Sequence, residues 1–207
     1  MEKKGEGKQG NLTLAATGDS LITRRLSTNV EEAFLSVVEL MRGADVAFTN
    51  LETTVHDFQG YPAAQSGGAW MVSPPYVAEE LKWAGFNLLS RANNHTMDWS
   101  MGGMFATSEI LDRAGLTHAG VGKNLAEARR PAYIDTKKGR VALISASSSF
   151  APWGAAGHAR REVQGRPGLN PLRYDTTYCV REEAFETLKK TIEELGLTRY
   201  SFSGKPD

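Results

Sequence analysis

The stretch Ser90-Arg91-Ala92-Asn93-Asn94-His95-Thr96-Met97-Asp98 places amide, imidazole and carboxylate side chains directly behind an apolar run. That run, Phe86-Asn87-Leu88-Leu89-Ser90, follows Gly85 and predicts a short buried strand that ends in a turn. Open α/β sheets bind ligands at the carboxyl ends of their strands, which makes the polar cluster a candidate site. An Asn-rich turn also caps helices, so the cluster alone leaves both interpretations open.

Two earlier apolar runs end in polar residues in the same way. Residues 12–17 lead into Gly18-Asp19-Ser20, and residues 44–49 lead into Asn50-Leu51-Glu52. Three parallel strands would bring the polar side chains at their ends to one edge of the sheet. These side chains are Asp19, Glu52, Asn94 and His95. Carboxylate and amide oxygens suit a divalent cation, and a nearby imidazole can bind the cation or donate a proton.

The segments between and after these strands show helical spacing of apolar residues. They cover residues 30–41, 73–83 and 101–114, with a glycine after each, and a fourth covers residues 182–195. Residues 132–136 and 140–144 flank Lys137-Lys138-Gly139, which predicts a hairpin that adds antiparallel strands to the sheet. The pattern predicts an α/β fold in which helices cover a mainly parallel sheet.

Composition excludes several classes of protein. The 207 residues, 41% of them hydrophobic, are enough for one globular domain. The 24 basic and 24 acidic residues balance, which argues against a nucleic-acid partner, and the single Cys179 forms no internal disulfide. No apolar segment approaches the roughly 20 residues that span a membrane, and residues 1–10 do not resemble a signal peptide. We therefore expect no transmembrane segment and a cytoplasmic location.

Three motifs in order resemble the CapA family of capsule-synthesis proteins, also called the poly-γ-glutamate capsule biosynthesis (PGA_cap) family, of the calcineurin-like metallophosphoesterase superfamily. They are Gly18-Asp19, Asn50-Leu51-Glu52, and Ala92-Asn93-Asn94-His95 with Asp98. Residues 165–173 also resemble a segment from one branch of the family. The resemblance implies a calcineurin-like metallophosphatase sandwich with αββα layers, of which this chain holds the N-terminal portion. We expect a flexible tail over residues 1–10 and one C-terminally truncated domain over residues 11–207.

The resemblance also implies roles for five residues. Asp19, Glu52 and Asn94 would bind metal, with Glu52 bridging two ions. His95 would contact the scissile group or protonate the leaving group, and Asp98 would orient the site through hydrogen bonds. The implied cofactor is one or two divalent ions, of manganese, iron, zinc or magnesium. Members of the family are often membrane-associated.

The chain departs from the superfamily in its histidines. The position two residues after Asp19, customarily histidine, is Leu21 here, and the later histidine-rich metal motifs are absent from the sequence. After Asp98 only His118 and His158 remain. We interpret His118 as structural and expect that His56, just beyond Glu52, is not a ligand.

A long irregular region over residues 145–177 predicts a wall that faces the substrate. It contains Arg160, Arg166 and His158, and guanidinium groups suit the capture of carboxylate or phosphate. Solvated surface arginines are the competing interpretation. The expected partner is a small or polymeric anionic substrate.

Two functions remain in view. The first is a metal-dependent hydrolase that acts on a phosphoester or a γ-glutamyl amide bond in capsule or poly-γ-glutamate metabolism. The second is a non-catalytic component of a capsule synthesis or export assembly, in which the same pocket binds an anionic polymer. Nucleotide binding is a distant third, because no phosphate-binding loop is present.

Overall fold

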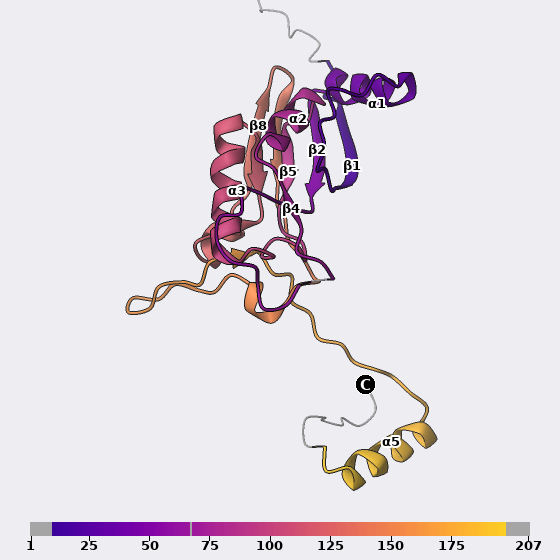
Figure 1. Cartoon of the computed structure of the whole chain (residues 1–207). Coiled ribbons are helices and arrows are strands. Elements are labelled where there is room, and N and C mark those ends of the chain that lie inside the picture. Colours follow the sequence, from indigo (N-terminus) through magenta and orange to yellow (C-terminus); the bar gives the residue numbers. More distant parts are fainter. Residues whose placement is uncertain (1–9, 67, 198–207) are drawn as a thin grey trace, which may run out of the picture. The chain divides into compact units, whose positions relative to one another are not determined.

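A computed structural model describes residues 10–66 and 68–197 (Figure 1). The chain divides into two compact units, one ending at Arg173 and the other beginning at Tyr174. Of the tail predicted over residues 1–10, all but Gly10 lies outside the described residues. The assignment of residues 11–207 to one domain stays a prediction.

The first unit is built on a four-stranded parallel sheet. Its strands lie in the order β1 (Leu14–Ser20), β2 (Val46–Leu51), β5 (Leu88–Ser90) and β6 (Thr117–Ala119). In the register of the sheet Asp19 lies opposite Asn50, and Asn50 lies opposite Ser90. The predicted parallel arrangement of the first three strands is confirmed, and their carboxyl ends meet at one edge.

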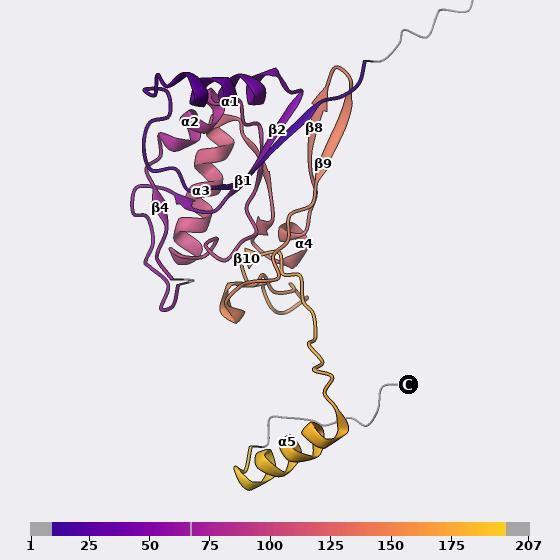
Figure 2. The same ribbon diagram turned by 90° about the vertical axis from the view of Figure 1, so that its right-hand side faces the viewer.

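Three helices cover one face of this sheet, with the hairpin of β8 (Ala132–Thr136) and β9 (Gly139–Leu143) on its other side (Figure 2). They are α1 (Glu32–Gly43), α2 (Val77–Trp83) and α3 (Ser100–Ala114). Leu81, Leu89 and Leu111 are fully buried between helices and sheet, and each contributes about 1.5–3 kcal/mol by leaving water. Helix α3 ends because Gly115 adopts a left-handed conformation, with φ of 72°. The predicted α/β class is confirmed.

Short elements complete the first unit. They are β3 (Thr54–Val55) paired in parallel with β4 (Val72–Ser73), β7 (Val121–Gly122) paired with β10 (Gly168–Leu169), α4 (Leu125–Ala128) and the 3-10 helix η1 (Pro152–Gly154).

The predicted hairpin is present as β8 (Ala132–Thr136) and β9 (Gly139–Leu143). It does not join the parallel sheet as we expected; it forms a two-stranded sheet of its own. The edge strand β6 has only three residues and ends before Gly120, whose φ is 108°, so it offers little backbone for a further ladder. β8 contacts β6 without pairing with it.

The second unit holds the predicted fourth helix, α5 (Glu182–Glu194). None of its residues is buried. Within residues 10–66 and 68–197, no helix combines the length and the apolar character needed to cross a membrane.

Asp45 ties the beginning of the sheet together. Its carboxylate accepts hydrogen bonds from the backbone N–H and the hydroxyl of Thr13, both at 2.7 Å, and from Lys138 Nζ at 2.9 Å. Thr13 directly precedes β1, and Lys138 lies in the hairpin turn. The hydrogen bonds from Thr13, followed by the hydrogen bond from Lys138, lower the pKa of Asp45 from 3.8 to about 2.

This pKa predicts a pH-dependent contribution to stability. The folded pKa is below the unfolded one, so the contribution is complete above pH 3.8 and is lost as the pH falls toward 2. In urea denaturation between pH 7 and pH 2.5, the stability advantage of the parent over Asp45→Asn should shrink below pH 3.8. A pH-independent difference between the two proteins would contradict this.

Candidate metal centre at the edge of the parallel sheet

Two carboxyl groups meet where β1 and β2 end. Asp19 is the second-last residue of β1, an edge strand, and is exposed, whereas Glu52 directly follows β2 and is half-buried. Burial raises the pKa of Glu52 above its usual value, and a hydrogen bond to Asp19 and the negative charge of Asp19 raise it further. In the protein without metal, the neighbouring Asp19 therefore disfavours the ionised form of Glu52.

A line of amide hydrogen bonds joins the three strand ends. Asn50 Nδ2 donates to Asp19 Oδ1 at 2.8 Å, and Asn50 Oδ1 accepts from Asn93 Nδ2 at 3.1 Å. Asn93 Nδ2 also donates to the carbonyl of Leu51 at 2.9 Å, and Asn93 Oδ1 accepts from the backbone N–H of His95 at 3.0 Å. The order of side chains across the edge is therefore fixed by hydrogen bonds as well as by the sheet register.

The loop that carries Asn93 is a structured turn and not a helix cap. Thr96 Oγ1 donates to the carbonyl of Arg91 at 2.6 Å and accepts from the N–H of Asn93 at 2.9 Å, which closes the turn. The N-cap of α3 is Trp99, with no side-chain cap. The helix-cap interpretation of the Asn-rich cluster is therefore wrong.

His95 and Asp98 form a hydrogen-bonded pair at this edge. His95 Nδ1 lies 2.7 Å from Asp98 Oδ2, and the side chains are 13% and 2% exposed. The N–H of Met71 donates to the same oxygen at 2.6 Å. Burial raises the pKa of Asp98, against the hydrogen bonds from Met71 and His95 that lower it. Asp98 is thus an acceptor held in place from two sides, and it leaves His95 Nε2 available at the site.

Asn94 lies between Asn93 and His95 and is half-buried. Among the described residues, none donates a hydrogen bond to its side-chain amide or accepts one from it. Its neighbour Asn93, in contrast, uses both its amide nitrogen and its amide oxygen within the protein. Of these two neighbouring amides, the amide of Asn94 is therefore the one that could bind a ligand.

The donor set fits a hard divalent cation. Asp19 and Glu52 offer carboxylate oxygens whose proximity raises the pKa of Glu52, and Asn94 offers a neutral amide oxygen. Within the described part of the chain, no three His, Cys, Asp or Glu side chains converge as a complete ligand cluster. The residues at this edge that could hold an ion are Asp19, Glu52 and Asn94.

The irregular region reaches the site through its backbone and its small polar side chains. Ser145 Oγ accepts from the N–H of Ala92 at 3.0 Å and lies 2.8 Å from Ser90 Oγ. Asn170 Nδ2 donates to the carbonyl of Ser145 at 2.8 Å. These contacts pack the segment around residues 145–170 against the loop after β5.

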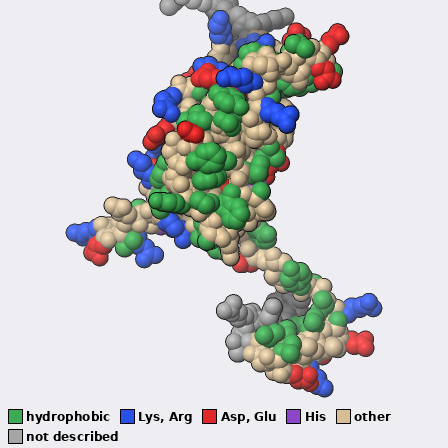
Figure 3. Space-filling model, in the orientation of Figure 1, with side chains coloured by type: hydrophobic (Ala, Val, Ile, Leu, Met, Phe, Trp, Pro, Cys, Tyr) green, Lys and Arg blue, Asp and Glu red, His purple; other side chains and the backbone are tan. Residues whose placement is uncertain are grey.

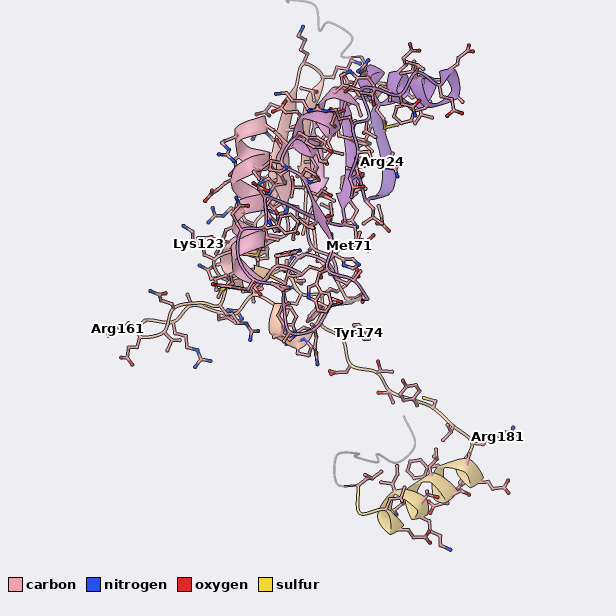
Figure 4. The ribbon with its side chains drawn as sticks, in the orientation of Figure 1. Arg24, Met71, Lys123, Arg161, Tyr174 and Arg181 are labelled. Atoms are coloured by element: carbon pink, nitrogen blue, oxygen red, sulfur yellow. The ribbon has the colours of Figure 1, made fainter. Side chains whose placement is uncertain are left out.

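The three predicted substrate-binding residues lie on the outer part of this region. Arg166 Nε donates to the carbonyl of Ala155 at 2.8 Å, so its guanidinium braces the loop. His158 and Arg160 are exposed, and Arg160 pairs with Val163 in a turn. Arg161, labelled in Figure 4, lies at the outer end of this turn, where Figure 3 shows acidic as well as basic side chains. The structure does not bring these residues into contact with Asp19 or Glu52.

Four residues of the site were not singled out from the sequence. Asn50 and Asn93 stood inside the quoted motifs, and their positions in adjacent parallel strand ends could have indicated them. Met71 and Ser145 act through long-range contacts, which no local pattern signals.

Comparison with known proteins identifies the family. A family model described as "Bacterial capsule synthesis protein PGA_cap" matches residues 13–197. The chain belongs to the PGA_cap family. Its parallel sheet and helices are consistent with the calcineurin-like fold of the superfamily that includes PGA_cap.

Relatives of this PGA_cap chain include two uncharacterized proteins, y4sH and y4uA, from Sinorhizobium fredii (strain NBRC 101917 / NGR234). Each is 42% identical over 186 residues, which cover 88% of this chain and 40% of the relative. The capsule biosynthesis protein CapA of Bacillus anthracis is 26% identical over 167 residues, which cover 77% of this chain and 40% of CapA. The chain thus spans about 40% of the length of the curated relatives it matches.

The amide line predicts the effect of removing its central donor. In Asn93→Ala, Asn50 Oδ1 and the N–H of His95 lose their partners, so the free energy of unfolding should fall by about 1–3 kcal/mol. Urea denaturation measures this loss. Asn29→Ala is the control, because the Asn29 side chain is exposed and accepts one local hydrogen bond; its effect should stay within about 0.5 kcal/mol. Equal effects of the two substitutions would contradict the prediction.

Proposed function

We propose that this chain carries the metal- and substrate-binding edge of a divalent-metal-dependent hydrolase in capsule or poly-γ-glutamate metabolism. The bond it cleaves is a phosphoester or a γ-glutamyl amide. The main support is that the interacting carboxyls of Asp19 and Glu52 and the His95–Asp98 pair lie at the carboxyl ends of three adjacent parallel strands, where Asn94 carries an amide that makes no hydrogen bond to the described residues. Membership of the PGA_cap family connects this site to capsule biosynthesis.

Asp19, Glu52 and Asn94 would hold the metal. Two carboxylates supply negative charge, and a neutral amide completes binding without cancelling the rest of the charge of the ion. A divalent ion held there would supply a Lewis acid for a phosphoryl or carbonyl oxygen and would lower the pKa of a bound water. Asn50 keeps the carboxylate of Asp19 in place by its hydrogen bond.

His95 would act as the proton donor to the leaving group. The Met71 N–H can only donate, and it donates to Asp98 Oδ2, the oxygen that also faces His95 Nδ1. In the proposed site Asp98 therefore accepts a hydrogen bond from His95 Nδ1–H, and this bond directs His95 Nε2 toward the site. As a general acid, His95 would carry a proton on both ring nitrogens, with Asp98 as the partner of Nδ1–H and the leaving group facing Nε2–H.

An anionic substrate would approach from the side of the irregular region. Arg160 and His158 are exposed there, with no partner among the described side chains, and the guanidinium of Arg160 suits carboxylate or phosphate. Arg166 would contribute through the shape of the loop that it braces.

Metal binding is the first requirement of this proposal. Glu52→Gln and Asn94→Ala should each weaken Mn²⁺ binding at least about tenfold in isothermal titration calorimetry, because each removes a ligand. Glu162→Gln is the matched control, since it removes an exposed acid from the Arg160–Val163 turn, and it should leave the affinity unchanged. Hydrolysis of a generic phosphodiester and of a γ-glutamyl peptide, measured in the same proteins, should fall in parallel.

Two outcomes would overturn the proposal that the chain is part of a hydrolase. One is Mn²⁺ affinity that is equal in the parent, Glu52→Gln and Asn94→Ala. The other is a chain that binds poly-γ-glutamate without metal and hydrolyses neither compound, which would favour the alternative of a non-catalytic component that binds an anionic polymer.

A further inference from the structure

A second histidine, His56, connects to His95 through a continuous line of hydrogen bonds. His56 Nε2 lies 3.0 Å from Thr54 Oγ1, and Thr54 Oγ1 donates to the carbonyl of Met71 at 2.7 Å. The N–H of Met71 then donates to Asp98 Oδ2 at 2.6 Å, and Asp98 Oδ2 lies 2.7 Å from His95 Nδ1. Met71, labelled in Figure 4, thus connects both halves of this line through its own backbone.

The chemistry of the groups fixes the direction of each hydrogen bond. The hydroxyl of Thr54 has one hydrogen, and it points to the Met71 carbonyl, which can only accept. Toward His56, Thr54 Oγ1 is therefore an acceptor, so His56 carries its hydrogen on Nε2. His56 is 1% exposed, and burial lowers its pKa and so favours the neutral ring. Its Nδ1 is then an acceptor.

Ordinary packing does not explain why a histidine occupies this position. Within the described part of the chain, only two buried side-chain nitrogens have no hydrogen-bond partner, His56 Nδ1 and Trp99 Nε1. A buried polar atom without a partner costs about 1–3 kcal/mol. An apolar residue would avoid that cost at position 56, but it could not donate to Thr54.

The surroundings of His56 hold it rigidly. Its ring packs edge-on against Trp99, the residue after Asp98, with centroids 5.2 Å apart. Phe58 and Ser100, whose φ angles are 54° and 53°, are the two non-glycine residues with positive φ among those described, and both flank this contact. Gly60 and Gly102 approach so closely that a Cβ added to Gly102 would lie 2.7 Å from Gly60 Cα. Strained backbone of this kind persists where the surrounding structure enforces a geometry.

We propose that His56 and Thr54 are positioning residues that set the orientation of His95 through Met71 and Asp98. Thr54 holds the Met71 carbonyl, and His56 holds the hydroxyl of Thr54 in the rotamer that does so. The backbone of Met71 is thereby held at its carbonyl by Thr54 and at its N–H by Asp98 Oδ2, on either side of its Cα. Asp98 in turn holds His95 in the Nδ1–H tautomer, with Nε2 directed to the site. The functional meaning of this line rests on the proposed role of His95.

The test reads tautomers directly by ¹⁵N NMR of the metal-free full chain, about two pH units above the usual histidine pKa of ~6.5. The chain has only four histidines, so substituting each in turn assigns the spectrum. In the parent, His56 should be the Nε2–H tautomer and His95 the Nδ1–H tautomer. A parent spectrum with His56 as the Nδ1–H tautomer would overturn the proposal without any variant.

Variants test the coupling between the two histidines. Thr54→Val keeps the shape but removes the hydroxyl, and it should shift the tautomer ratio of His95 toward Nε2–H by roughly 2- to 10-fold, the effect of one net hydrogen bond. Thr54→Ser should restore the parent ratio. His56→Leu should shift the ratio in the same direction as Thr54→Val, and His56→Gln, whose amide can donate to Thr54, should shift it less.

Thr107→Val is the matched control. Thr107 is also fully buried in this region, but its hydroxyl bonds to Val55 and Gly103 and not to the line. It should destabilise the fold without changing the tautomer of His95. Equal shifts in Thr107→Val and Thr54→Val, or no shift in Thr54→Val, would overturn the proposal. The tautomer measurement needs neither metal nor turnover. A wrong hydrolase proposal can therefore be distinguished from a wrong proposal about His56 and Thr54.

Discussion

The side-chain amide of Asn50 is the contact on which the candidate site depends. It donates to Asp19 on β1 and accepts from Asn93 in the loop after β5, so one residue of the central strand links both neighbouring strand ends. An amide can do this because it carries a donor and an acceptor at fixed geometry. A carboxylate at the same position could not donate to Asp19, and a hydroxyl could not span both neighbours with separate atoms.

Both the sheet pairing and the side-chain hydrogen bonds determine the structure of this edge. Parallel pairing brings the strand ends together, and burial of leucines beneath the helices stabilises that pairing. The polar line then fixes side-chain directions: Asn93 sets the backbone at His95, and Asp98 sets its imidazole. Burial and the neighbouring Asp19 raise the pKa of Glu52, so this arrangement disfavours the ionised form of that carboxyl.

Most of the strands and helices of the fold could be predicted from the local sequence. The apolar runs before Asp19, Glu52 and Asn93 predicted the three parallel strands correctly. Helical spacing predicted α1, α3 and α5 to within two residues at both ends of each helix. The start of α2 was expected too early, because Ser73 belongs to β4 and its pairing with β3 is non-local. The hairpin was predicted, but whether it joined the sheet depended on the short β6. The roles of Met71, Thr54 and His56 arise from contacts between separate segments, and no periodicity or motif encodes them.

Paramagnetic broadening by Mn²⁺ tests the central claim, that the ends of three parallel strands form one cation site. In an amide NMR titration of the full chain with substoichiometric Mn²⁺, the signals of Asp19, Glu52 and Asn94 should broaden first and together, while those of Glu39 on α1 and Glu109 on α3 broaden only at higher Mn²⁺. Both acids are exposed and belong to the same compact unit as the site, so they serve as an internal comparison. Broadening that begins at these two acids, or that is uniform along the chain, would contradict a shared site at the sheet edge.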